Sequence, residues 1–174
     1  MKTRPALFAA IVVSCFGACG VLGPPDLSGV YQASIHTEDK TGCGPGSPVA
    51  GVSIFRLEPV NLLGTQAYKY ELCYSTAPSS CLDLGLLSIR FTTPASDGWT
   101  DDTYTATSSG SSCALSHSVS SAVRQGDSGL RVEFRRYRLQ SSIPASGCTR
   151  QAAIDQRDSL TCVSSELQIA TRVN

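Results

Sequence analysis

Apolar and polar residues alternate with a period of two along most of this chain, and this alternation restricts the fold more than any other feature. Tyr68, Tyr70 and Leu72, for example, alternate with charged residues. Because successive side chains of a β-strand point to opposite faces, the pattern predicts half-buried strands. The segments that we predict as strands are residues 31–35, 51–59, 68–74, 86–93, 103–107, 114–124, 130–139 and 167–173.

Turn-forming residues separate these segments at intervals of about eight to twelve residues, as in all-β domains. Residues 41–48 are rich in Gly and Pro, and residues 126–129 read Gly-Asp-Ser-Gly. One helix is expected over residues 149–157, where Gln-Ala-Ala-Ile-Asp-Gln favours helix locally. The sequence therefore predicts one antiparallel barrel or sandwich of about eight strands, with one short helix near the C-terminus.

The N-terminus has the order of a secretory signal peptide. Lys2 and Arg4 precede an apolar run, and small residues follow it. The run is about ten residues long, whereas a membrane-spanning helix needs roughly 20. We expect residues 1–18 to be a signal peptide, residues 19–26 a lipid anchor and tether, and residues 27–174 one all-β domain.

The end of this signal resembles the lipobox of bacterial lipoproteins, on the residues Phe16-Gly17-Ala18-Cys19-Gly20. The resemblance implies cleavage before Cys19, acylation of the protein there, and anchoring in the cell envelope. The absence of Asp after the cysteine implies the outer membrane. Two readings stay open: Val12-Val13-Ser14-Cys15 also fits the lipobox and would make Cys15 the anchor, and the protein could be secreted without lipid.

Cysteine counts favour Cys19, because cleavage there leaves an even number of further cysteines, whereas cleavage before Cys15 leaves an odd one. In an exported chain, six cysteines imply up to three disulfides. Fifteen pairings are possible and the connectivity stays open, although Cys73 and Cys81 flank the turn at residues 76–80 closely enough to bridge across a hairpin if the register allows. A metal site would need closer spacing than any of these pairs offers. The six cysteines are Cys43, Cys73, Cys81, Cys113, Cys148 and Cys162.

Charge argues against nucleic acid as a partner. Without Lys2 and Arg4 the exported chain has a formal charge of −2, which gives no long-range attraction for polyanions. We expect anchoring in the membrane through the lipid alone, and no cofactor or metal.

Two short stretches resemble known families. Leu27-Ser28-Gly29-Val30-Tyr31 resembles the Gly-x-Trp start of lipocalin-type barrels, with Tyr in place of Trp, which implies a barrel able to carry a small apolar ligand. Gly126-Asp127-Ser128-Gly129 resembles the nucleophile motif of chymotrypsin-like proteases. Leu130 follows where that family has Gly, and no histidine stands in an Ala-His-Cys setting, so we predict a turn at Ser128 and not a nucleophile.

The two histidines and one acidic segment have simple structural interpretations. His117 shares a strand face with Leu115, so we expect it at the edge of the core with a hydrogen-bonded neighbour. His36 lies opposite Ile35 and is expected in solvent. The acidic segment could supply part of a calcium shell, but its spacing matches no EF-hand, and we predict a solvated loop. That segment contains Asp97, Trp99, Asp101 and Asp102.

Four arginines give residues 130–139 a cationic character. The apolar phase of this segment changes after Phe134, which suggests a bulge near Arg135 and Arg136 and a charged edge strand that avoids pairing with other chains. An anionic partner such as lipid headgroups or polysaccharide is the other reading. The arginines are Arg131, Arg135, Arg136 and Arg138.

The sequence as a whole favours a cell-envelope lipoprotein with a non-catalytic binding or structural role. A lipocalin-like carrier of a small apolar ligand is the second possibility, and a hydrolase that uses Ser128 is the least favoured.

Overall fold

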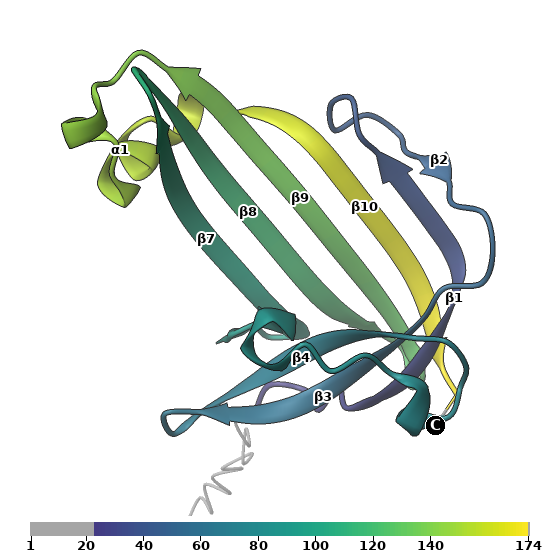
Figure 1. Ribbon diagram of the computed structural model, residues 1–174. Coiled ribbons are helices and arrows are strands. Elements are labelled where there is room, and N and C mark those ends of the chain that lie inside the picture. The colour runs from purple at the N-terminus through teal and green to yellow at the C-terminus, as the bar shows by residue number, and fades with distance from the viewer. Residues whose placement is uncertain (1–22, 174) are drawn as a thin grey trace, which may run out of the picture.

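A computed structural model describes residues 23–173, and these form one antiparallel sheet that curls into a nearly closed barrel (Figure 1). The order of strands is β5-β4-β3-β1-β10-β9-β8-β7-β6, and β2 pairs with β1. The predicted all-β class is confirmed, and the architecture is a barrel. The strands are β1 (Gly29–Asp39), β2 (Ser47–Pro48), β3 (Ile54–Leu62), β4 (Thr65–Cys73), β5 (Ile89–Phe91), β6 (Thr93–Pro94), β7 (Gly98–Ser109), β8 (Ser112–Gln125), β9 (Gly129–Ser141) and β10 (Thr161–Arg172).

The barrel closes through the short segment of β5 and β6. Phe91 in β5 pairs with Tyr68 in β4, and Thr93 in β6 pairs with Thr100 in β7. This one segment therefore joins the two ends of the sheet. In Figure 1, β3 and β4 cross the lower end of the molecule, while β7–β10 run on well beyond them. The part of the long strands beyond this crossing presents an open inner face.

An aromatic core fills the closed end of the barrel. Tyr31 stacks on Phe55 with ring centroids 5.5 Å apart, and Tyr68 meets Trp99 edge-on at 5.2 Å. Residues just before the barrel seal it: the Trp99 indole donates to the Pro25 carbonyl, and the Tyr68 hydroxyl donates to the Asp26 carboxylate. The last two residues of the predicted tether are thus held by the barrel. The fully buried members of this core are Leu27, Phe55, Leu57, Tyr68, Phe91, Ala122, Leu130 and Val132.

A second, smaller core lies on the outer face of β7–β9. Helix α1 (Arg150–Asp155) packs there, at the upper left in Figure 1, with Ala153 fully buried. Thr149 caps the helix by accepting a hydrogen bond from the Ala152 N–H. Single-turn 3-10 helices occur at η1 (Pro78–Ser80), η2 (Gly85–Ser88), η3 (Ala145–Gly147) and η4 (Arg157–Ser159).

The second core explains the change of apolar phase along β9. Phe134 faces the barrel interior, whereas Tyr137 and Leu139 face outward into the second core. The β8–β9 register is continuous through this region, so the predicted bulge at Arg135 and Arg136 is wrong. The irregularity lies in the neighbouring strand β10, between Cys162 and Ser164. Strand β9 is also not an edge, because β8 and β10 pair with its two sides.

All six cysteines of the described chain form disulfides, as the sequence predicts. Cys73–Cys81 closes the loop after β4, and Cys113–Cys148 ties β8 to the segment before α1. Cys43–Cys162 joins the loop after β1 to the start of β10. The Cα–Cα separations are 3.9, 5.6 and 5.4 Å respectively.

Two predicted boundaries need correction. The strand expected over residues 86–93 begins as η2, and only Ile89–Phe91 and Thr93–Pro94 pair as strands. Strand β7 begins at Gly98, so the expected acidic loop is largely strand. The predicted signal peptide and the cysteines Cys15 and Cys19 lie outside the described residues. Within residues 23–173, no helix has the length and apolar character needed to cross a membrane.

Candidate functional site

The open inner face of the long strands is built in rows, because directly paired residues of antiparallel strands point to the same side. The first row, read from β7 to β10, belongs largely to the aromatic core and contains Trp99, Ala122, Val132 and Gln168. The next row contains Asp101, Ser120, Phe134 and Glu166. The two rows beyond it contain Thr103, Ser118, Arg136 and Ser164, then Thr105, Ser116, Arg138 and Thr161. The face thus changes from apolar to acidic to cationic along the strands.

A groove of about 640 Å³ lies over the middle of this face. Its floor includes Phe134, Arg136 and the serines around them. Its other side is an apolar wall that the end of β4 and the following loop supply. We call this the leucine wall, and its members are Leu72, Leu82, Leu84 and Leu87.

The side chains of the leucine wall are exposed to solvent although they are apolar. Leu84 is 61% and Leu87 is 74% exposed, and Tyr74 and Leu86 nearby are also largely in solvent. Most of the large exposed apolar side chains of the described chain fall in residues 72–87. Clustered apolar exposure of this kind marks contact sites more often than scattered single residues do.

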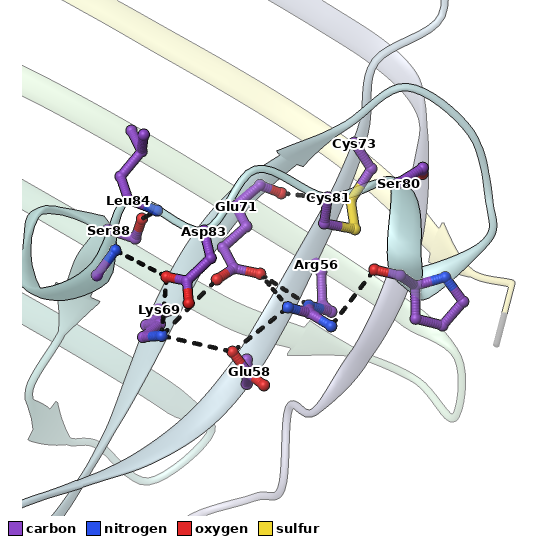
Figure 2. Close-up of polar contacts among 12 residues, drawn as sticks. Arg56, Glu58, Lys69, Glu71, Cys73, Ser80, Cys81, Asp83, Leu84 and Ser88 are labelled. Carbon is purple, nitrogen blue, oxygen red and sulfur yellow. Dashed lines mark hydrogen bonds and ion pairs between the residues drawn. A yellow bond between two sulfur atoms is a disulfide. The ribbon is translucent and has the colours of Figure 1, made fainter.

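A charged cluster on the outer face of β3 and β4 holds the wall in place (Figure 2). Lys69 lies 3.0 Å from the Asp83 carboxylate, and this contact lowers the pKa of Asp83. Asp83 in turn accepts from the Gly85 N–H at the start of η2. The Ser88 hydroxyl accepts from the Leu84 N–H at 3.1 Å. Together with the Cys73–Cys81 bridge, these contacts fix the path of residues 74–88.

His36 lies on the inner face and not in solvent, which corrects the prediction. Its Nδ1 is hydrogen-bonded to Ser53 Oγ, and its Nε2 lies 2.9 Å from Glu166 Oε1. The buried Gln168 amide donates to the same Glu166 oxygen, and Gln168 also bonds Tyr70. Glu166 lines the groove, whereas Ser53 is not among its lining residues. The contacts therefore position Glu166 and do not present the serine to a ligand.

His117 agrees with the prediction of a histidine at a core edge. Its ring stacks on Tyr104 at 4.1 Å and on Tyr137 at 5.5 Å, and its Nε2 lies 2.6 Å from Asp102 Oδ1. This position is on the outer face of β8, away from the groove.

The acidic segment does not gather its carboxylates. Asp101 faces inward and accepts from the Thr92 and Thr103 hydroxyls, while Asp102 faces outward to His117. Within residues 23–173, no three His, Cys, Asp or Glu side chains are placed to hold a metal ion. Trp99 is a strand residue buried in the aromatic core, so it offers no contact surface.

Ser128 lies in the exposed turn between β8 and β9, as predicted for the Gly-Asp-Ser-Gly motif. Its backbone carbonyl accepts from the Arg172 N–H at 2.8 Å. Both histidines are hydrogen-bonded to residues other than Ser128.

The four arginines of β9 are divided between two faces. Arg131 and Arg135 point outward and pair with Glu133. Arg136 and Arg138 point inward, in the two cationic rows of the groove face. The sequence showed that positive charge gathers in residues 130–139. It did not show which arginines point into the groove, because that depends on which face of β9 is inside the barrel.

No protein-family model matches this chain, and no curated protein or solved structure matches it significantly.

Proposed function

We propose that this protein is a non-catalytic binding protein of the cell envelope, which holds a small amphipathic molecule in the groove. The observation that carries the proposal is the pairing of the leucine wall with a floor of hydroxyl and charged side chains. The volume of about 640 Å³ falls in the range of roughly 300–1,000 Å³ that small-molecule sites occupy.

The composition of the groove separates this proposal from its rivals. A wholly apolar ligand, as in the lipocalin-like reading, would strip water from Ser118, Ser120 and Arg136 without replacing its hydrogen bonds, which is unfavourable. A purely structural role gives no reason for exposed leucines beside a polar floor. A molecule with an apolar chain and a polar head satisfies both surfaces.

The proposed location follows from the N-terminal sequence. Export by residues 1–18, lipid on Cys19 and a short tether would hold the barrel close to a membrane, where amphipathic molecules are concentrated. We place the protein at the outer membrane, on the resemblance of residues 16–20 to a lipobox.

A titration tests the proposal. We expect the purified barrel to bind monomeric dodecyl maltoside, followed by calorimetry below the critical micelle concentration. Leu84→Ser/Leu87→Ser should weaken this binding about tenfold or more, because each leucine contributes roughly 1.5–3 kcal/mol when its side chain is fully covered. Leu63→Ser is the matched control, since Leu63 is fully exposed in the β3–β4 turn and does not line the groove. Equal affinity in all three proteins, or no binding at all, would contradict the proposal.

A further inference from the structure

We infer that the groove selects a single-chain amphiphile with an anionic head, a phosphate or a carboxylate, and that Arg136 and Arg138 hold this head. The inference rests on the proposed binding function and specifies the chemistry of its ligand.

The two guanidinium groups are neighbours without anionic partners. Arg136 and Arg138 are two positions apart on the same strand face, which separates their Cα atoms by about 7 Å. Neither guanidinium has an ion pair or hydrogen bond to any of residues 23–173. The arginines of the outer face behave differently, because Arg131 and Arg135 share Glu133. Like charges placed side by side favour the binding of an anion between them.

Hydroxyl groups flank both arginines. Ser118 and Ser164 pair with Arg136 from the two sides, and Ser116 pairs with Arg138. None of these three hydroxyls is hydrogen-bonded within the described chain. Hydroxyls and guanidinium groups together are donors suited to phosphate and carboxylate oxygens.

The carboxylates of the same face already have hydrogen-bond or ion-pair partners. They lie one row nearer the core: Glu166 contacts His36 at 2.9 Å, and Asp101 accepts from Thr92 and Thr103. Glu38, opposite Glu166 on β1, pairs with Lys40 at 2.9 Å. These partners reduce the repulsion that the acidic row would exert on an anionic ligand, and they leave the arginines free to bind it.

The leucine wall fixes the direction of the ligand. Phe134 precedes Arg136 by two positions on the inner face, and the wall lines the groove with both of these residues. An apolar chain can therefore lie on Phe134 and the leucines while its head reaches Arg136, which lines the groove, and Arg138, which lies one row beyond the lining residues. Arg90, which also lines the groove, adds a third positive charge near this path.

The test compares head groups on one alkyl chain. Dodecyl phosphate, dodecanoate, dodecyl maltoside and dodecyltrimethylammonium are titrated as monomers into the wild type and into Arg136→Gln/Arg138→Gln. We expect the wild type to prefer the two anions. The double variant should lose about tenfold or more in affinity for dodecyl phosphate, because the charge-assisted hydrogen bonds to its head are lost. Its affinity for dodecyl maltoside should fall much less, because the uncharged head forms no ion pair with either arginine.

A matched variant controls for net charge. Arg131→Gln/Arg157→Gln removes the same charge from positions that do not line the groove, and it should bind dodecyl phosphate as the wild type does. Thermal unfolding of all variants checks that they are folded. Suppose that the Arg136/Arg138 variant keeps its affinity for dodecyl phosphate while Leu84→Ser/Leu87→Ser loses it. The inference of an anionic head is then contradicted, but the proposed binding of an amphipathic molecule in the groove is not. If neither the arginine variant nor the leucine variant changes the affinity for dodecyl phosphate, the proposed function is contradicted as well.

Vesicles separate a groove ligand from a membrane surface. Phosphatidylglycerol vesicles, with phosphatidylcholine vesicles as reference, should bind the purified protein more weakly than monomeric dodecyl phosphate does. Arginine-dependent binding to the vesicles without binding of the monomer would overturn the inference in favour of lipid headgroups at a surface.

Discussion

The guanidinium of Arg56 holds the buried carboxylate of Glu71 directly across the β3–β4 ladder, with Arg56 Nε 2.8 Å from Glu71 Oε2 (Figure 2). The Glu71 side chain is completely buried beneath residues 74–88. Its Oε1 accepts no hydrogen bond from residues 23–173, and Lys69 Nζ lies 3.9 Å from it. A buried carboxylate with so few contacts depends strongly on its single close cation.

Removing that cation should be costly. We predict that Arg56→Met lowers the free energy of unfolding by about 3 kcal/mol, because the buried Glu71 carboxylate then keeps only the more distant Lys69 ammonium as a cation. Arg56→Met/Glu71→Met should recover most of the loss, since no charge then remains buried. Urea unfolding of the two variants measures this. Arg157→Met removes an exposed arginine near Asp158 and should change stability by no more than about 0.5 kcal/mol. A similar small effect for Arg56→Met would contradict the prediction.

The disulfides should contribute different amounts to the free energy of unfolding. No free thiol is expected at the six cysteines under non-reducing alkylation and mass spectrometry. Because a longer closed loop restricts the unfolded chain more, losing Cys113–Cys148 should cost about 1 kcal/mol more than losing Cys73–Cys81, whose separations are 35 and 8 residues. Paired serine substitutions and urea unfolding compare them. The reverse order would mean that native contacts, and not the unfolded chain, set the difference.

Buried tyrosines make the barrel sensitive to alkaline pH. Burial raises the pKa of Tyr68 from 10 to about 12, and it also raises the pKa of Tyr31 and Tyr70. The folded state therefore retains protons that the unfolded chain releases, so stability is complete below pH 10 and falls as the pH rises toward 12. Urea unfolding at several pH values should show this fall. Tyr68→Phe should make it shallower, while Tyr74→Phe, at an exposed ring, should leave its slope unchanged.

The sequence was sufficient to predict features that depend on neighbouring residues. Cys73 and Cys81 flank a short turn-forming segment, so the chain brings them together in almost any hairpin, and the structure bridges them. The helix near the C-terminus was predictable for the same reason, because its cap at Thr149 and its helix-favouring residues are local. The alternation likewise predicted the all-β class without knowledge of the strand order.

The floor of the groove could not be predicted, because it reverses the usual rule that apolar positions face inward. In β10, Glu166 and Gln168 occupy inner positions while Leu167 and Ile169 face outward. In β9, Tyr137 faces outward because its side chain packs in the second core. Which face of each strand is inside follows from barrel closure and from where α1 docks, and both depend on contacts between residues far apart in the chain.

The membrane anchor can be tested independently of the barrel. We predict that Cys19→Ser releases the protein into the soluble fraction, because the proposed lipidation site is lost, whereas Cys15→Ser leaves it on the membrane. Cell fractionation followed by a mass spectrum of the exported protein gives the cleavage site and the lipid together. The opposite pattern would make Cys15 the anchor, and solubility of the wild type would indicate secretion without lipid.

Ser128 should prove catalytically inert. Its turn is exposed, and the two histidines are engaged elsewhere: His36 contacts Ser53 and Glu166, and His117 contacts Asp102. A serine becomes a nucleophile when an oriented base and donors for the developing oxyanion lie next to it, and an exposed turn supplies neither. Ser128→Ala should therefore change stability by only a few tenths of a kcal/mol, as surface substitutions do, and should leave amphiphile binding unchanged. Fluorophosphonate labelling of the wild type that disappears in Ser128→Ala would show instead that the serine is reactive.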